Sequence, residues 1–383
     1  MKISCTQNNL SEGLSIVSHL ATKNIQLPIL SHVLIQIEDR VLKLTSTNLE
    51  IAISVKLRAK VDVPGSFTVP AKLLADFVNL LPADRVDLEQ NGDALVVSSK
   101  TTNTTIKGTG ATDFPLIPKI DQGEKYRLSA PELKRALERV IFAAAGTQTR
   151  PELTGVLFRF DAVKGELALA ATDSFRLAEA RVRAEAKANG SFILPARAVS
   201  EVIRILGSVS DDMQSGDEVE ITRGESQVLF SYRGVELISR IIEERYPDYQ
   251  NIIPEKFLTT VRVERAALAN AVRTASLFSR SGLYDVMLTI IPGESAVEVA
   301  ASDGNVGQSK ARLAAEVTGA QNGITLNFRY LLDGVGAAPG EFISLQMNDG
   351  GSPCLLVPSA AETGKEGTGT SDSYLYLVMP IRQ

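Results

Sequence analysis

Few residues in this chain have the side chains that metal binding or nucleophilic catalysis needs. Among 383 residues there are two histidines, His19 and His32, and two cysteines, Cys5 and Cys354. The cysteines lie near opposite ends, with no CxxC pair and no metal-ligand spacing, so we expect strand positions in a reduced protein for them. The sequence also has no glycine-rich phosphate loop, GxSxG or HExxH motif. We therefore expect no metal, no cofactor and no catalytic residue.

Acidic or amide side chains recur at the ends of three predicted strands, and this pattern has two interpretations. Asp173 and Asp303 each follow an alternating apolar run and a small hydroxyl residue, and Asn48 has the corresponding place in a third run. Two carboxylates can serve acid–base catalysis. Because an amide replaces the carboxylate in one copy, the pattern favours a structural turn whose side chain accepts hydrogen bonds from local backbone N–H groups. An enzyme with an unidentified substrate is left as a remote alternative.

These strand ends belong to a pattern that occurs three times along the chain. An amphipathic helix pattern contains Leu10, Leu133 and Leu268, with copies 123 and 135 residues apart. A Gly-Ser-Phe segment before a second helix occurs at residues 65–72 and 190–197, with a weaker match at 324–329. Repeats of this length indicate domains rather than solenoid units. Helices are expected to begin near residues 9, 71, 131, 196, 264 and 328, among short alternating strands.

Proline-containing turns mark the ends of the first two copies. They lie at residues 113–118 (DFPLIP) and 246–254 (YPDYQNIIP). Such segments are typical of boundaries between domains. We therefore expect domains at residues 1–122, 123–254 and 255–383, each large enough to bury its own core.

Composition narrows the class of protein further. A net charge of −5 argues against coating nucleic acid through a broad basic face, although a local basic surface is compatible with it. The first residues alternate as a strand and no later run of 18 apolar residues exists, so a cytoplasmic protein is expected, neither secreted nor membrane-spanning. Residues 359–373, rich in Gly, Ser and Thr, predict a mobile hairpin loop. The final ten residues begin as a strand that Met379 and Pro380 end, which predicts an apolar surface tail.

Four segments are more specific than the repeats. They are residues 27–30 (LPIL), 171–178 (ATDSFRLA), 245–249 (RYPDY) and 378–382 (VMPIR). With the repeats, they resemble the bacterial DNA sliding clamp, the beta subunit of DNA polymerase III, over residues 1–383. The resemblance implies the α+β class, with three repeated domains of the DNA-clamp fold, each with two helices packed on antiparallel sheets, in a head-to-tail dimeric ring. It also implies a non-catalytic processivity factor of DNA replication that encircles duplex DNA and slides without sequence specificity.

The resemblance implies that helices line the hole of the ring. A sliding ring meets DNA through dispersed phosphate contacts rather than base-edge contacts. The cations on the predicted helices and at their ends are Lys23, Lys72, Lys134, Arg135, Arg139, Arg197, Arg204, Arg265, Arg273, Arg280 and Arg329. Of these, Lys72, Arg197 and Arg329 occupy matched positions in the three copies. The alternative is that all are solvated faces of ordinary amphipathic helices.

The resemblance also implies a groove between the second and third domains, where partners dock a short peptide. Carried over by position, its residues are Leu153, Thr172, Ser174, Phe175, Arg176, Leu177, Pro247, Asn251, Ile252, Leu377, Val378, Met379, Pro380 and Arg382. Most are apolar, as an anchor pocket requires, although Leu377 and Val378 alone would also fit a strand's core face. Ser174 stands where the family usually has Gly, Phe175 where it often has His or Tyr, and Asn251 where some members are basic. The chemistry of the groove's rim is therefore left open.

In the family the ring closes between the first and third domains. Here Leu277 and Phe278 would meet the edge strand near Thr104 and Ile106, where the sequence is Thr-rich. The expected partners are double-stranded DNA, a second copy of the chain, the replicative polymerase subunit, the clamp loader and repair proteins with clamp-binding peptides, with no membrane. An alternative is a specialised clamp paralogue, for inhibitor resistance or a narrower partner set, suggested by Ser174, Phe175 and the 359–373 loop.

Overall fold

The computed structural model describes residues 1–21, 27–38, 41–120, 122–147, 149–209, 216–359 and 373–381. The chain forms two compact units, Met1–Lys134 with Glu185–Ala188 and Ser200–Ile241, and Arg135–Ala184 with Asn189–Val199 and Ile242–Gln383. The first repeat lies in the first unit and the third repeat in the second. The central repeat is divided between the units, and its helices α3 (Ala130–Glu138) and α4 (Ala196–Ser208) each contribute to both.

The first unit contains two antiparallel sheets. Its strands are β1 (Lys2–Thr6), β2 (His32–Glu38), β3 (Val41–Thr47), β4 (Ile51–Arg58), β5 (Lys60–Val63), β6 (Gly65–Pro70), β7 (Arg85–Asn91), β8 (Ala94–Ser98), β9 (Asn103–Lys107), β10 (Thr109–Gly110), β11 (Glu124–Ser129), β15 (Glu185–Ala186), β17 (Glu218–Arg223), β18 (Gln227–Tyr232) and β19 (Val235–Arg240). Five strands form a sheet in the order β5-β1-β7-β8-β9, and ten form another in the order β10-β6-β2-β3-β4-β19-β18-β17-β11-β15. The helices α1 (Gln7–Ser18) and α2 (Ala71–Asn79) pack on each other, and the 3-10 turns are η1 (Pro28–Ser31) and η2 (Ala111–Asp113).

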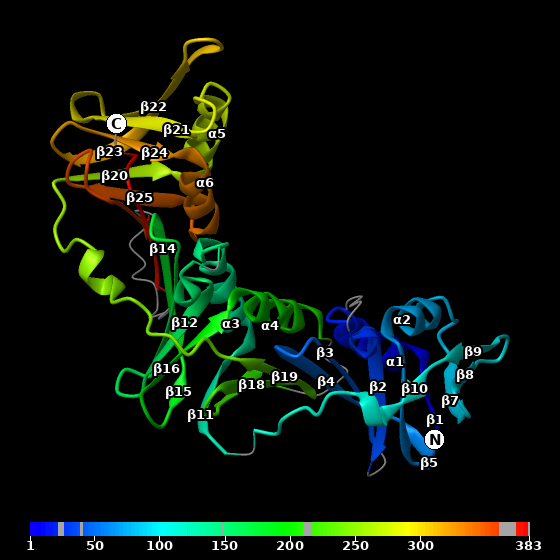
Figure 1. Ribbon diagram of the computed structural model, residues 1–383. Coiled ribbons are helices and arrows are strands. Elements are labelled where there is room, and N and C mark those ends of the chain that lie inside the picture. Colours follow the sequence, from blue (N-terminus) through cyan, green and yellow to red (C-terminus); the bar gives the residue numbers. More distant parts are fainter. Residues whose placement is uncertain are drawn as a thin grey trace. The chain divides into compact units, whose positions relative to one another are not determined.

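The second unit contains one long antiparallel sheet. Its strands are β12 (Gly155–Asp161), β13 (Glu166–Thr172), β14 (Arg176–Arg183), β16 (Gly190–Pro195), β20 (Thr259–Glu264), β21 (Asp285–Ile291), β22 (Ala296–Asp303), β23 (Gly307–Gly319), β24 (Asn322–Asn327), β25 (Phe342–Met347), β26 (Cys354–Ser359) and β27 (Ser373–Val378). Their order is β16-β12-β13-β14-β27-β26-β25-β20-β23-β22-β21-β24. The helices α5 (Arg265–Ser276) and α6 (Phe328–Ala337) lie side by side against this sheet (Figure 1). The 3-10 turns are η3 (Ile141–Ala143), η4 (Pro151–Leu153), η5 (Tyr249–Ile252) and η6 (Pro292–Glu294).

The six α-helices in the described part of the chain confirm the positions expected from the repeats. Each begins within two residues of its predicted start, and each follows directly on a strand. Local capping explains two of these starts, because the Thr6 side chain accepts a hydrogen bond from the backbone N–H of Asn9, and Asn327 accepts from Arg329 and Tyr330. The repeated leucines Leu10, Leu133 and Leu268 are fully buried, so the shared pattern marks the face that packs on the sheets.

The repeated strand ends form structural turns, as predicted. Asn48 Oδ1 accepts from the backbone N–H groups of Glu50 and Ile51 at 3.1 and 2.8 Å. Asp173 Oδ1 accepts in the same way from Phe175 and Arg176 at 2.9 and 3.0 Å, and Asp303 Oδ1 from Asn305 at 2.8 Å. These oxygens are occupied by local backbone donors, which is the arrangement of an Asx turn.

Each internal junction between repeats is a pair of antiparallel strands. The strand β19 of the second repeat pairs with β4 of the first, and β27 of the third pairs with β14 of the second. The chain thereby extends the sheet of one repeat with the sheet of the next. The end of β27 at Val378, before Met379 and Pro380, confirms the predicted end of the last strand, whereas most of the predicted 359–373 loop, residues 360–372, lies outside the described residues.

Candidate partner-binding groove and nucleic-acid interface

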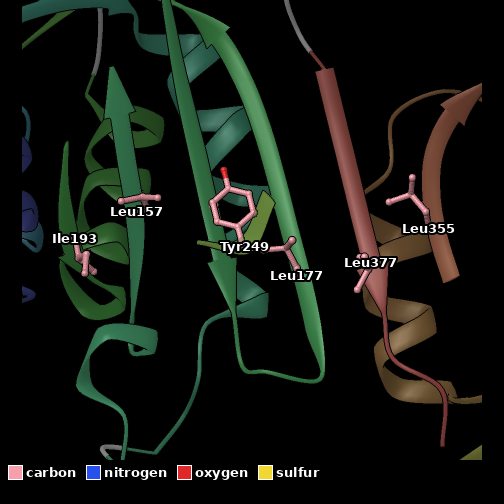
Figure 2. Close-up of a cluster of buried hydrophobic side chains, with 7 residues drawn as sticks. Leu157, Leu177, Ile193, Tyr249, Leu355 and Leu377 are labelled. Atoms are coloured by element: carbon pink, nitrogen blue, oxygen red, sulfur yellow. The ribbon is translucent and has the colours of Figure 1, made fainter. Parts of the chain in front are cut away.

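A buried apolar cluster lies on one face of the long sheet in the second unit. Its residues are Leu157, Ala170, Leu177, Ile193, Tyr249, Leu355 and Leu377. Figure 2 shows the labelled members side by side across neighbouring strands, with the Tyr249 ring among the leucines. The strand register explains this meeting, because Leu177 on β14 is the direct partner of Leu377 on β27. The cluster therefore joins the central repeat to the C-terminal repeat.

A turn and the chain's last described residues border this cluster. The backbone N–H of Met379 donates to the carbonyl of Phe175 at 2.8 Å, and Met379 packs against the cluster while remaining partly exposed. Phe175 is 62 % exposed, so an aromatic ring projects from the turn beside the tail. Ser174 has a φ of 77°, a left-handed conformation that favours glycine and costs a serine about 1 kcal/mol. An exposed aromatic next to a methionine is typical of a surface that accepts varied partners.

The segment after β19 covers the other side of the cluster. Ile242, Tyr246, Ile253 and Phe257 pack against it. The Tyr246 hydroxyl donates to the carbonyl of Ala170 at 3.3 Å. Pro247 is half-buried in this segment, while Asn251 and Ile252, the latter 49 % exposed, face solvent. The segment is thus fixed to the cluster by its packed side chains, while Pro247 and Ile252 expose apolar surface to solvent.

A buried hydrogen bond fixes this segment to the sheet. The Tyr249 hydroxyl donates to Glu179, which is 5 % exposed and also accepts from Arg181 Nε at 2.7 Å. Burial, and then the negative charge of Glu179, raise the pKa of Tyr249 well above its usual range. Burial likewise raises the pKa of Tyr246. Both phenols are therefore protonated hydrogen-bond donors at any physiological pH.

Arg176 is largely buried and links three parts of the second unit through its guanidinium group. Its side chain is 12 % exposed and binds Asp173 Oδ2 at 2.9 Å, Asp333 on α6, and the carbonyl of Phe142 at 2.7 Å. Its guanidinium also lies 4.4 Å from the centre of the Tyr330 ring. These contacts use most of its donors, so Arg176 holds the turn that carries Phe175 and is left few donors for a ligand.

The structure brings most of the predicted groove residues to this region, in different states. Leu153, Thr172, Leu177 and Leu377 are buried, Met379 and Pro380 are half-buried, and Ser174 and Phe175 are exposed. Val378 is fully buried but absent from the cluster, because alternate residues of a strand face opposite sides of the sheet. The expectation that both Leu377 and Val378 line the groove is therefore wrong for Val378. Arg382 lies outside the described residues.

Several residues of the site were not expected from the sequence. Leu157, Ile193 and Leu355 belong to the apolar cluster. The hydrogen bond between Tyr249 and Glu179 fixes the segment that packs over the cluster. At the rim, Arg150 Nη1 donates to Ser174 Oγ at 3.2 Å. The available signal was the alternation of β12 and β16, which marks which residues share a face but not which strands are neighbours.

The three matched cations are presented alike. Lys72, Arg197 and Arg329 are each the second residue of a helix, and each is exposed. The Arg329 guanidinium lies over the Tyr284 ring, 3.8 Å from its centre. Arg135 is also exposed, Arg273 is exposed with Nη1 bonded to Asn270 at 3.1 Å, and Lys134 and Arg139 are half-buried. Lys23 lies outside the described residues.

Three other predicted DNA contacts have their guanidinium groups engaged within the chain. Arg204 binds Glu201 Oε2 at 2.9 Å and the carbonyl of Ile16 at 2.8 Å. Arg265 donates to the carbonyl of Gly340 at 2.8 Å, and Arg280 pairs with Asp285. The alternative of a purely structural role is therefore stronger for Arg204, which joins α4 to α1, than for the matched cations.

The residues predicted at the chain-to-chain contact divide into two groups. Leu277 is 73 % exposed, Phe278 is half-buried, and Thr104 is half-buried on β9, the outer strand of its sheet. Ile106 is only 3 % exposed, because its side chain enters the core of the first unit. An interface role for the Ile106 side chain is therefore wrong, and only its backbone is left for pairing.

Comparison with known proteins gives matches along the whole chain. Family profiles for the DNA polymerase III beta subunit match as the N-terminal domain at residues 1–118, the central domain at 127–248 and the C-terminal domain at 250–367. The curated beta sliding clamps of Synechocystis and Synechococcus elongatus are 31 % and 30 % identical, covering 100 % of this chain and 99 % of their own length.

Solved structures agree with these matches. The DNA polymerase III beta subunit of Thermotoga maritima has a TM-score of 0.89 at 27 % identity, covering 100 % of this chain and 99 % of that chain. That of Pseudomonas aeruginosa has a TM-score of 0.90 at 25 % identity, covering 100 % of both chains. No helix in the described part of the chain is long and apolar enough to cross a membrane.

Proposed function

Because this chain belongs to the DNA polymerase III beta subunit family, it is a sliding clamp, a non-catalytic processivity factor of DNA replication, and we propose that two copies close head to tail around duplex DNA. The domains proposed for each copy are residues 1–122, 123–254 and 255–383. The observation that supports ring closure is that neighbouring repeats are joined by strand pairing, β19 with β4 and β27 with β14. The corresponding edges of the first and third repeats have no strand partner in the described chain.

The two free edges are equivalent to edges that are paired elsewhere. β9 is the last strand of the five-stranded sheet and matches β19 and β27 in the other repeats. Residues 307–313 of β23 pair with β22 on one side, while β20 pairs only from residue 315 onward. This part of β23 matches β4 and β14. If β9 of each copy pairs with β23 of the other, the dimer has two contacts of the same kind as the internal junctions. Both of these free edges are then paired in each copy.

The internal junctions also predict the register of this contact. The residue pairs that correspond at the two internal junctions are Ala52 with Ile238 and Leu177 with Leu377. Gln308 corresponds to Ala52 and Leu177, because all three pair with the hydroxyl residue at the end of the preceding strand in their own repeat. Thr105 corresponds to Ile238 and Leu377 by the same comparison of strand partners. The proposed interface thus places Thr105 opposite Gln308 and Thr104 opposite Ser309, where the internal junctions are more apolar.

The position of Leu277 supports the same contact. His19, Phe142 and Leu277 each lie nine residues after the repeated helix leucine. His19 Nδ1 lies 2.7 Å from Glu201 Oε1, and the Phe142 ring lies 5.6 Å from that of Tyr376, so both residues contact the following repeat. Leu277, the counterpart in the third repeat, is 73 % exposed in the described chain. A second copy would cover this apolar side chain.

For DNA, the proposal assigns direct phosphate contacts to the exposed helix cations. Lys72, Arg197 and Arg329 repeat at one position of the three domains, so a ring of two chains presents six such charges. Arg135, Arg273, Lys134 and Arg139 are further candidates. Because phosphate contacts carry no sequence information, this arrangement supports sliding along any duplex.

For partners, the proposal assigns peptide docking to the groove bordered by Phe175, Pro247, Ile252 and Met379 over the apolar cluster. Partly exposed apolar side chains above a buried floor supply an anchor site of the kind that short motifs use. The replicative polymerase subunit, the clamp loader and repair proteins with clamp-binding peptides are the proposed ligands. Because they share one groove, they would compete for it.

A covalent trap tests ring closure. The double variant Thr104→Cys, Ser309→Cys should form a disulfide between chains on mild oxidation, giving a species of twice 41.2 kDa that stays on nicked circular DNA in high salt and leaves when the DNA is linearised. Cys5 and Cys354 are buried, and burial raises the pKa of both thiols to about 12, so they will not interfere near pH 8. A single-chain mass by light scattering at micromolar concentration, with no cross-link, would refute the ring.

A further inference from the structure

An open cavity lies on the C-terminal repeat, outside the groove. It has a volume of about 370 Å³ and is lined by β21, β22, β23, β24 and the turn after α5. This volume lies near the lower end of the range of small-ligand pockets. Gln308 and Ser309 on its wall belong to the proposed pairing edge of β23, and the proposed function leaves the rest of the cavity without a role.

The floor of the cavity corresponds to the floor of the cluster in the central repeat. In each repeat a row of four residues crosses four paired strands, each residue being the direct partner of the next. The row in the central repeat is Ile193, Leu157, Ala170 and Glu179. The row in the C-terminal repeat is Thr325, Met287, Ala300 and Lys310. The cavity is therefore the equivalent of a site that the central repeat fills with its own chain.

The segment that fills the central site has a defined chemistry. Tyr249 places its ring in the apolar cluster and its hydroxyl on Glu179, the last residue of the row. In the C-terminal repeat the same floor is open, with Met287 46 % exposed and the Lys310 side chain 65 % exposed. The described chain reaches only the edge of this floor, where the backbone N–H of Ile381 donates to the carbonyl of Thr325 at 2.9 Å.

The charges around the open floor favour a neutral polar group. Lys310 Nζ lies 2.9 Å from Glu298 Oε1, and Arg280 pairs with Asp285, so the cavity walls consist of balanced ion pairs. A phenol is suited to this arrangement, since its oxygen can accept from Lys310 while its hydrogen is donated to Glu298. An aromatic ring would lie on Ala300 and against the Met287 thioether, which forms favourable contacts with aromatic rings.

We propose that this cavity is a second peptide-docking site, which takes a tyrosine side chain from an extended segment of a partner protein. The internal template is the chain's own covering segment, residues 246–253, in the central repeat. The site is separate from the groove, so a partner could use it while a clamp-binding peptide occupies Phe175 and Met379.

The probe is a synthetic fluorescent peptide with the sequence of residues 244–254 (ERYPDYQNIIP), titrated against the full-length protein by fluorescence anisotropy. We expect saturable binding. The variant Met287→Lys should weaken it at least tenfold, while Val163→Lys, at an exposed valine in the β12–β13 turn, should change it less than twofold. A peptide with Phe in place of the second tyrosine should bind several-fold more weakly, and one with Ala there at least tenfold more weakly.

Three results would overturn the proposal. The first is loss of binding in the groove variant Met379→Asp but not in Met287→Lys, which would place the peptide in the groove. The second is equal binding of the tyrosine and alanine peptides. The third is binding only in the dimer-breaking variant Leu277→Asp, which would mean that a second copy of the chain covers the cavity. Thermal unfolding within about 2 °C of the parent protein checks that Met287→Lys is folded.

Discussion

The backbone N–H of Met379 donates to the carbonyl of Phe175 at 2.8 Å, which fixes the last described residues of the chain to the turn after β13. The same contact occurs at the first junction, where the N–H of Arg240 donates to the carbonyl of Glu50 at 3.1 Å. Identical backbone geometry therefore supports a methionine and an exposed phenylalanine at one junction and charged side chains at the other. Under the proposed function, we therefore expect partner specificity to depend on these side chains rather than on the fold.

The first prediction concerns Met379→Asp. A carboxylate placed against the apolar cluster should weaken binding of a clamp-binding peptide at least tenfold, because the charge must be desolvated or the peptide's anchor displaced. The backbone bond to Phe175 remains, so the mass in solution should not change. Isothermal titration with the peptide and light scattering measure the two properties. The matched control, Val163→Asp, changes an exposed valine outside the cluster, and a similar loss there would contradict the assignment.

The second prediction concerns Tyr249→Phe. Removing the hydroxyl leaves the buried Glu179 with Arg181 but without the phenol, at a cost of about 1–2 kcal/mol. Because Tyr249 fixes the segment that carries Pro247 and Ile252, peptide affinity should also fall several-fold. Glu179→Gln should show a similar loss, and the double variant should lose less than the sum of the two. Additive effects on peptide affinity would mean that the phenol and the carboxylate do not act together.

The sequence predicted much of the fold because the relevant signals are local and repeated. The helix starts, the Asx turns at Asn48 and Asp173, and the end of β27 just before Met379 each follow from a few neighbouring residues. Three copies of the pattern reinforced each other. A residue type that recurs at the same position in two or three repeats therefore indicates a structural role, such as that of the Asx turns.

The rest of the site depends on which strands are neighbours. Glu179 and Tyr249 are 70 residues apart and meet only because the segment after β19 returns over β13 and β14. Likewise, helical periodicity places Arg204 on α4, three residues after Glu201, but does not reveal that the carbonyl of Ile16 in the first repeat binds it. Contacts between residues of different repeats cannot be predicted from local sequence patterns.

The third prediction concerns pH and the pair of strands β11 and β17. Glu220 accepts from Lys125 Nζ at 2.9 Å and from Arg127 Nη2 at 2.9 Å, and these hydrogen bonds hold the pKa of Glu220 below its usual range. A lowered pKa in the folded state stabilises the fold above the unfolded value of about 4.3, and this gain is lost as the pH falls through the folded pKa. Glu220→Gln should lower the Tm by about 1–2 °C at pH 7, since the pair is partly exposed.

The control for this prediction is the pH series itself. The difference in Tm between the parent protein and Glu220→Gln should shrink between pH 5 and pH 3, measured by scanning fluorimetry at constant ionic strength. A difference that persists unchanged at pH 3 would show that the carboxylate's charge does not contribute.

The fourth prediction separates DNA contacts from structural cations. Lys72→Glu, Arg197→Glu and Arg329→Glu should each shorten retention on nicked circular DNA and leave peptide affinity unchanged, because their side chains are exposed on helices. Each lost phosphate contact should reduce the slope of log K against log salt by about 0.9. Arg58→Glu, at an exposed cation on strand β4, is the matched control and should change retention little.

Arg204→Ala should behave differently from these three. Its loss leaves Glu201, which is 5 % exposed, with His19 as its remaining partner, so the main effect should be a lower Tm. If instead Arg204→Ala kept its Tm and lost DNA retention as much as Arg197→Glu, then Arg204 would contact phosphate directly. In that case the phosphate would bind guanidinium hydrogens that Glu201 and Ile16 do not use, since a guanidinium has five N–H donors and these two contacts take only Nε and one hydrogen of Nη2.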